Sequence, residues 1–257
     1  MKPAIVFPLV DPDGSMFSHL QAVLPDLKQH FEKAFLTIPK ITQEGQPENI
    51  YLLEQDDFFR LFPRESEKPI GDHFAFLYRQ AAAAVEPEQI MHLCSVDRLI
   101  FALRTGYREQ FLFDVDGLSD EHLPLLFHRS EKAWATHPVN YFELESFVTD
   151  IGQTLFGKRL DYGWCHMAIQ AGRLREVMSL VKEHDLSMVA ELLLHLQADI
   201  KTRDVDWLAW EDPFILGRDA DELKRERENS LAETQKRLSY VLPMVELLVK
   251  FSKNGKE

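Results

Sequence analysis

The chain of 257 residues contains few cysteines, and this shortage excludes two classes of protein. Its two cysteines, Cys94 and Cys165, are too few for a disulfide framework, and they form no CxxC pair of the kind that binds zinc. Both lie in apolar stretches, LCS and WCHM. We therefore expect buried, inert thiols.

The chain is also short of basic charge. Its 29 Lys and Arg residues stand against 42 Asp and Glu residues, which gives a net charge of −13 at pH 7. A surface that binds DNA or RNA must neutralise many phosphates with Lys and Arg. The charge therefore argues against a nucleic-acid partner, although it leaves room for a small basic pocket that binds one anion.

Long apolar runs are missing as well. The run at residues 4–10 is interrupted by Pro8 and followed at once by Asp11, so it predicts neither a signal peptide nor a membrane span. We expect a cytoplasmic protein. With 45% apolar and 28% charged residues, the composition is that of an ordinary globular protein with a full core.

The first half of the chain alternates short apolar runs with amphipathic stretches, which favours an α/β fold with a mostly parallel sheet. Helices are expected over 15–31 and 71–85. The stretch RLIFALRTGY (98–107) fits a helix or a strand. The apolar runs predict strands over residues 4–10, 34–38, 50–53, 89–94 and 110–115.

The second half is expected to be mostly helical. We divide the chain into an α/β half, 1–120, and a helical half, 121–257, which together form one continuous domain. One predicted helix covers residues 189–196. The last segment carries an apolar stripe from Leu231 to Leu248, which either packs on the same chain or pairs with a second copy to form a homodimer.

The stretch FLFDVDGL (111–118) resembles the way in which haloacid-dehalogenase-like phosphatases present a nucleophile and an acid, here Asp114 and Asp116. That mechanism also needs a downstream strand that ends in Ser or Thr. The stretch LLFHRS (125–130) offers Ser130 after an apolar run, but it comes too early to leave room for a crossover helix. The phosphatase remains an alternative, but we favour a structural role for these aspartates at the end of a strand.

Acidic residues also follow several of the predicted strands. In open parallel sheets, ligands bind beyond the carboxyl ends of the strands, so acids at these ends are candidate ligand contacts. The candidates are Asp11, Glu54 or Asp56, Asp97 and Asp114.

This order of elements resembles the GT-A glycosyltransferases, in which a short acidic motif holds a divalent metal ion against a nucleotide-diphospho-sugar. The matching position is Cys94 to Asp97, where Ser95 replaces the first aspartate of the DxD motif. The resemblance implies that Asp97 holds Mg²⁺ or Mn²⁺ and acts in catalysis. It further implies that the donor contacts Asp11, Glu54 and Arg98.

Two segments of the second half, 129–145 and 154–168, loosely resemble the acceptor-side segments of glycosyltransferases related to mannosylglycerate and glucosylglycerate synthases. The resemblance implies a catalytic role for His137 and a metal-ligating role for His166. Trp164 adds another flat ring. The acceptor-side candidates are Trp134, Tyr141, Lys158 and Arg159, whose aromatic faces suit sugars and whose cations suit an anionic acceptor.

Each candidate also has a structural alternative. Asp97 can cap a helix, Asp11 can form an Asx-type turn, and the tryptophans and His166 can belong to the core. Lys158 and Arg159 can form a solvated turn. The acids of WEDPF (210–214), expected in a loop, can approach the cleft or face water.

The favoured function is metal-assisted transfer of a hexose from a nucleotide sugar to a small acceptor, which can be anionic. One alternative is a noncatalytic protein of the same fold that binds a sugar nucleotide, because half of the acidic motif is missing. A helical interaction protein is the other alternative class.

Overall fold

The computed structural model describes residues 2–65, 70–163 and 166–254. Across these ranges seven strands form one sheet in the order β3-β2-β1-β4-β6-β5-β7, in which β6 alone is antiparallel to its neighbours. The predicted α/β class with a mostly parallel sheet is confirmed. The strands are β1 Ala4–Pro8, β2 Ala34–Pro39, β3 Phe59–Arg64, β4 Ile90–Leu93, β5 Leu125–Arg129, β6 Met167–Gln170 and β7 Lys201–Val205.

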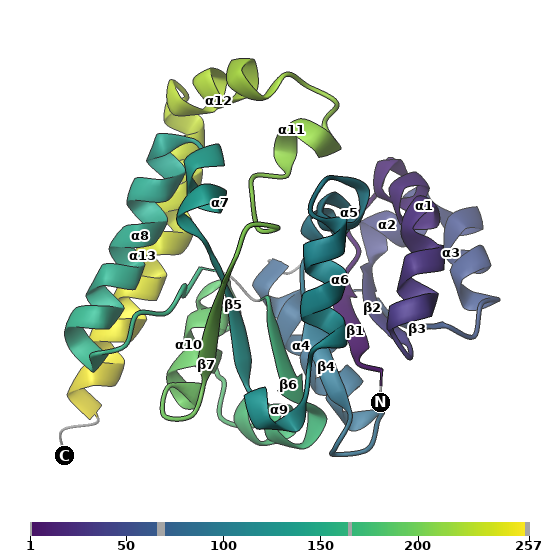
Figure 1. Cartoon of the computed structure of the whole chain (residues 1–257), viewed down its shortest axis with the longest axis horizontal. Helices are drawn as coiled ribbons and strands as arrows, with labels where there is room; N and C mark the ends of the chain where they lie inside the picture. Colours follow the sequence, from purple (N-terminus) through teal and green to yellow (C-terminus); the bar gives the residue numbers. More distant parts are fainter. Residues whose placement is uncertain (1, 66–69, 164–165, 255–257) are drawn as a thin grey trace.

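Helices cover both faces of the sheet (Figure 1). The first half contributes α1 Ser15–His30, α2 Lys40–Gly45, α3 Pro47–Glu54, α4 Ile70–Ala83, α5 Val96–Arg104, α6 Arg108–Asp116 and the 3₁₀ turn Asp120–His122. The second half contributes α7 Glu131–Thr136, α8 Val139–Phe156, α9 Ala171–Met178, α10 Ser187–Leu196, α11 Asp212–Ile215, α12 Ala220–Glu228 and α13 Leu231–Asn254.

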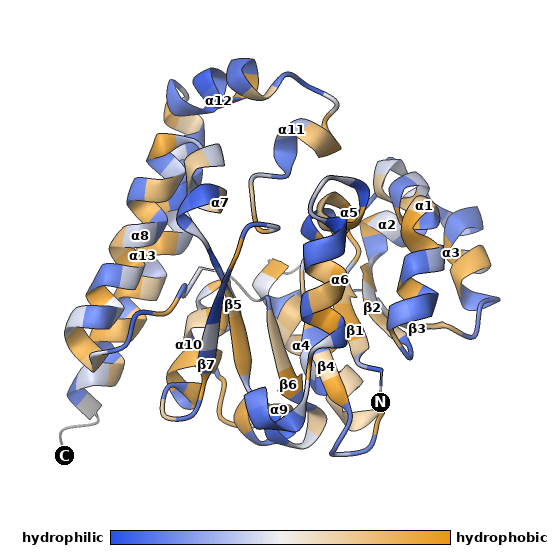
Figure 2. Ribbon diagram, viewed as in Figure 1, coloured by the Kyte–Doolittle hydropathy of each residue, from blue (hydrophilic) through white to orange (hydrophobic). Residues whose placement is uncertain are grey.

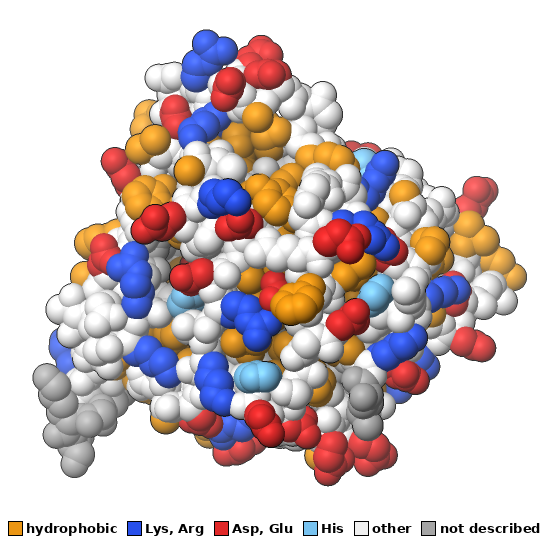
Figure 3. All heavy atoms as spheres, in the orientation of Figure 1, with side chains coloured by type: hydrophobic (Ala, Val, Ile, Leu, Met, Phe, Trp, Pro, Cys, Tyr) orange, Lys and Arg blue, Asp and Glu red, His pale blue; other side chains and the backbone are white. Residues whose placement is uncertain are grey.

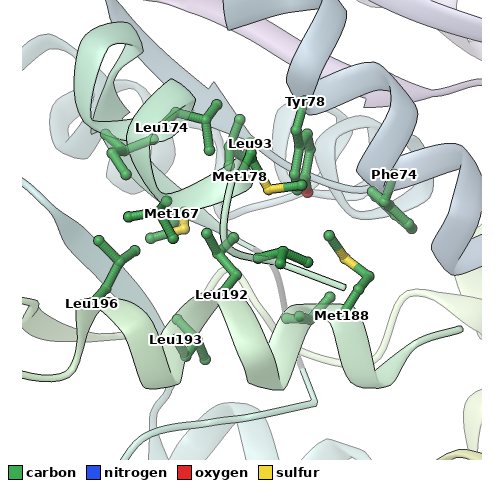
Figure 4. Packing of buried hydrophobic residues seen from close by; sticks show 14 of the residues in the cluster. Phe74, Tyr78, Leu93, Met167, Leu174, Met178, Met188, Leu192, Leu193 and Leu196 are labelled. Carbon is green, nitrogen blue, oxygen red and sulfur yellow. The ribbon is translucent and has the colours of Figure 1, made fainter. Parts of the chain in front are cut away.

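Alternation along the strands builds two cores. In β1, Val6 joins the core under α4, α9 and α10, whereas its neighbours Ile5 and Phe7 join the core under α1, α5 and α6. In Figure 2, helix α10 is mostly orange and therefore apolar, as its burial in the first core requires. Figure 4 shows the first core from close by, with Leu192 and Met188 of α10 beside Met178 and Tyr78.

Two of the predicted strands are wrong. Residues 50–53 lie in α3, which begins with Pro47 at its first position, and residues 110–115 lie in α6. Phe113 of α6 is 76% exposed, which the sheet interior would not allow. The strand that follows β2 in the sheet is instead β3, at its edge.

Residues 121–257 are mostly helical, as expected, but they also add β5, β6 and β7 to the sheet of the first half. The apolar stripe of α13 packs on α8 and α10 of the same chain, with Val241, Met244 and Leu248 buried. The homodimer stays a prediction. Within the described residues, no helix combines the length and apolar character that a membrane crossing requires.

Candidate functional site

The candidate site lies at the carboxyl ends of the parallel strands. Asp97 stands in the first turn of α5, which begins directly after β4. Because β6 runs antiparallel and pairs its first residue with Leu93, the last residue of β4, His166 lies at the same edge of the sheet. The Ser95 amide donates to His166 Nε2 at 3.4 Å, so the altered acidic motif and this histidine are neighbours.

Arg98 joins this edge to the segment that follows β7. Its guanidinium lies 3.0 Å from the Glu211 carboxylate and donates to the Leu208 carbonyl at 3.0 Å. The same group donates to His137 Nε2 at 3.4 Å, while His137 Nδ1 donates to the Ala133 carbonyl. Arg98 and Glu211 are both buried, so this pair is fixed inside the protein.

Three carboxylates therefore stand near one another, those of Asp97, Glu211 and Asp212. Burial raises the pKa of Asp97, which the neighbouring Arg98 charge opposes and Asp212 reinforces. Burial likewise raises the pKa of Glu211 to about 7, against the effect of Arg98 and with that of the two aspartates. Asp97 and Asp212 are partly exposed, so this cluster of acids reaches solvent.

The two histidines of the site are neutral. Burial holds the pKa of His137 well below its ordinary value, and Arg129 and Arg98 lower it further. Burial does the same for His166, with the added effect of Arg98. His166 packs edge-on against Trp207, at 5.7 Å between ring centroids, and is an interior histidine whose metal-ligating role stays a prediction.

The two other predicted donor contacts do not join this group. The Asp11 carboxylate is buried and accepts from the Phe17 amide at 2.8 Å, which satisfies an amide in the first turn of α1. Asp13 Oδ1 accepts from the amide two residues on, as in an Asx-type turn. Glu54 is exposed at the end of α3.

A cavity of about 700 Å³ opens beside this edge, between β5, β7, α7, α8 and α12. It is lined by three of the predicted site residues, Trp134, His137 and Arg159. His137 belongs both to the cavity wall and to the Arg98 contact, so it connects the cavity with the buried Arg98–Glu211 pair.

The inner wall of the cavity rests on a buried arginine. Arg129 donates to both carboxylate oxygens of Asp161 at 2.9 Å and lies 2.6 Å from Glu145. Its guanidinium also lies 3.4 Å from the centre of the Trp134 ring. These contacts fix Trp134 at the cavity wall. The sequence analysis considered only Ser130 in the stretch LLFHRS (125–130) and did not identify the neighbouring Arg129 as a site residue.

Tyr141 and Lys158 lie elsewhere. The Tyr141 hydroxyl donates to Glu233 at 2.6 Å, and burial raises its pKa. Lys158 donates to the Gln197 and Ile200 carbonyls, which follow the end of α10. Arg159, at the cavity mouth, pairs with Asp150 at 2.6 Å. Trp164 and Cys165 lie outside the described residues.

The phosphatase alternative loses its basis in this geometry. Asp114 and Asp116 lie in helix α6 instead of at a strand end. Asp114 Oδ1 accepts from Arg203 and Oδ2 from the Trp207 indole, both at 2.9 Å. Both oxygens of the supposed nucleophile are thus engaged in structural contacts.

Comparison with known proteins gives one kind of match. Neither a family model nor a curated protein matches the chain. Among solved structures, it is similar to glucosyl-3-phosphoglycerate synthase from Mycobacterium tuberculosis in complex with uridine diphosphate. The two are 11% identical, the alignment covers 95% of this chain and 80% of the other, and the TM-score is 0.48.

Proposed function

We propose that this protein binds a nucleotide sugar at the carboxyl edge of its sheet and transfers the hexose to a small acceptor in the neighbouring cavity. The observation that carries the proposal is the position of His137, which lines the cavity and contacts Arg98 at 3.4 Å. Asp97, the residue before Arg98, begins the helix that follows β4. Binding of a donor beside Asp97 would therefore place its sugar next to the acceptor.

His137 fits a role in orienting the reactants. Its Nδ1 proton is held by the Ala133 carbonyl, and its Nε2 accepts from Arg98. Burial and two arginines keep the ring neutral. In this state His137 can hold the Arg98 guanidinium next to Asp97 and present its ring to an acceptor in the cavity.

Asp97 and Asp212 fit a divalent ion of the Mg²⁺ or Mn²⁺ type. Within the described residues, no group of three or more His, Cys, Asp or Glu side chains is arranged to hold a metal ion. However, Mg²⁺ at phosphate sites is usually bound by one or two carboxylates together with substrate phosphates. Burial raises the pKa of Asp97 and the Asp212 charge adds to this effect, so a bound cation would favour the charged form of Asp97. Such an ion would stabilise the charge of the leaving diphosphate.

The proposal is tested by thermal unfolding with UDP-glucose and GDP-mannose, each with and without MnCl₂. A ligand that binds the native state raises its stability, so we expect at least one donor to raise Tm, and more so with Mn²⁺. Asp97→Ala should lose the Mn²⁺-dependent part and abolish transfer while it keeps the fold. Asp57→Ala, at an exposed acid before β3, is the matched control. If neither donor stabilises the wild type, the proposal is wrong.

A second candidate is a noncatalytic protein that binds the sugar nucleotide without metal. It is favoured by the buried pair of Arg98 with Glu211, which places a fixed cation next to Asp97. In this case the donor would stabilise the protein equally with and without Mn²⁺, and no nucleoside diphosphate would be released on addition of any acceptor.

A further inference from the structure

The cavity beside His137 has a balanced charge. Three cations line it, Arg129, Arg159 and Lys224, and three carboxylates line it as well, Glu131, Asp161 and Asp204. Figure 3 shows the same mixture of basic and acidic side chains over this face of the molecule. Equal numbers of cations and carboxylates leave the cavity without an overall charge that attracts anions.

Two of the three cations at the cavity are already paired with carboxylates. Asp161 takes up two donors of Arg129, and Arg159 is paired with Asp150. The lining histidines add no charge, because burial lowers the pKa of both His128 and His137. A phosphate or carboxylate would have to displace these pairs, whereas hydroxyl groups can donate to the carboxylates and accept from the cations at once.

Aromatic and small hydroxyl side chains complete the lining. Trp134 and Phe142 meet edge to face, with 5.3 Å between ring centroids, and Ser146 and Thr149 stand further along α8. Phe142 is 42% exposed and Trp134 partly exposed, so both rings offer apolar surface to a ligand. Flat apolar surface beside many donors and acceptors suits the faces and hydroxyls of a pyranose.

We propose that this cavity binds a neutral saccharide, so that the acceptor of the transfer is itself a sugar. The role of this sugar as an acceptor rests on the proposed function, but the binding of a neutral sugar can be tested without any donor. The volume of about 700 Å³ lies within the range of small-molecule sites and leaves room for more than one ring.

The test is saturation-transfer NMR on the full chain with maltose and cellobiose as neutral probes, and with D-glycerate as an anionic probe. We expect transfer to the ring protons of at least one disaccharide and a dissociation constant that is about tenfold weaker or more in Phe142→Ala, which removes a contact of aromatic size. Phe147→Ala is the matched control, because Phe147 also lies on α8 and is 49% exposed but does not line the cavity.

Three results would overturn the inference. The first is absence of transfer to both disaccharides at millimolar concentration. The second is equal weakening by Phe142→Ala and Phe147→Ala, which would place the sugar elsewhere. The third is tight binding of D-glycerate that Arg159→Ala abolishes. These results are independent of the donor experiment. Disaccharide binding by a protein whose Tm neither UDP-glucose nor GDP-mannose raises would support the inference and contradict the proposed function.

Discussion

The Arg98 guanidinium lies 3.0 Å from the Glu211 carboxylate inside the protein, where two further acids, Asp97 and Asp212, stand close to the pair. Burial and these acids raise the pKa of Glu211 to about 7 despite Arg98. The pair therefore joins α5 to the segment after β7. The Glu211 carboxyl group of this pair takes up a proton near neutral pH. His137 contacts the same guanidinium, so the state of Glu211 bears on the cavity wall.

The first prediction concerns Glu211→Gln. The pKa of Glu211 is higher in the native state than its ordinary value, so between about pH 4.5 and 7 the native state binds more protons than the unfolded chain. The wild type should lose stability as the pH rises through this range, whereas the variant has no such proton. In urea unfolding at pH 5, 6 and 7, the variant should gain about 1.4 kcal/mol per pH unit relative to the wild type. An opposite trend would mean that Arg98 outweighs burial and lowers this pKa.

The second prediction concerns His92→Phe. His92 is fully buried among aromatic rings, with Phe127 stacked at 5.4 Å, and neither ring nitrogen has a hydrogen-bond partner within the described residues. Burial lowers its pKa to about 3. Below about pH 6.5, His92 binds a proton in the unfolded chain but stays neutral in the native state. Each pH unit of acidification therefore lowers the free energy of unfolding of the wild type by about 1.4 kcal/mol.

Phenylalanine fits the same aromatic surroundings and removes this proton. Between pH 7 and pH 5, the wild type should lose about 2 kcal/mol more than His92→Phe in urea unfolding. Comparison of the two pH slopes cancels any constant packing difference between the side chains. Parallel curves would show that His92 does not titrate as its burial implies.

The sequence predicted the central strands because they are fully buried apolar runs. Strands β1, β2 and β4 and helices α1, α4 and α10 are confirmed. The two wrong strands are short apolar runs in helices, where the period cannot be judged over four to six residues. Strands β3, β5, β6 and β7 were not predicted. Two of them lie at the edges of the sheet, where proline and charge are tolerated: β3 contains a proline and β7 has the sequence KTRDV.

The site shows the same division. The rule that acids gather after parallel strands placed Asp97 correctly at the carboxyl edge, and the aromatic stretch 129–145 contains much of the cavity wall. The partners could not be predicted, because Arg98 meets Glu211 and Arg129 meets Asp161 only after the chain has folded. The sequence predicted a loop for WEDPF and left open whether its acids approach the cleft or face water, whereas the structure begins α11 at Asp212 and buries Glu211 against Arg98. The catalytic, donor-binding and metal-binding roles stay predictions.

The third prediction separates a structural from a catalytic role of Asp114. Asp114→Asn replaces one carboxylate oxygen, which accepts a hydrogen bond, by an amide nitrogen, which donates. This nitrogen would face Arg203 or the Trp207 indole, and both of these are donors. We expect a loss of about 1–3 kcal/mol in the free energy of unfolding. Asp116→Asn is the matched control in the same helix, where the aspartate is exposed and pairs with His30, and it should cost less than about 1 kcal/mol. Hydrolysis of p-nitrophenyl phosphate by the wild type that Asp114→Asn abolishes at unchanged stability would contradict this prediction.

The fourth prediction is that Gly152→Ala destabilises the protein although it improves helix propensity. Alanine is favoured over glycine inside a helix by about 1 kcal/mol. A methyl group at position 152 of α8, however, would stand 2.1 Å from Tyr162 Cε2, and the Tyr162 ring is completely buried. The ring must move, and overpacking of this kind costs about 1–3 kcal/mol.

Tyr162 follows Asp161, which holds Arg129 beneath Trp134, so the displaced ring should also disturb the cavity. We therefore expect Gly152→Ala to lower Tm and to weaken disaccharide binding together. Gly106→Ala is the control, because a methyl group there meets nothing within 4 Å and should change the free energy of unfolding by less than about 0.5 kcal/mol. A variant as stable as the wild type would mean that Tyr162 has room to move, and sugar binding that survives a large loss of stability would separate the cavity from the packing beneath α8.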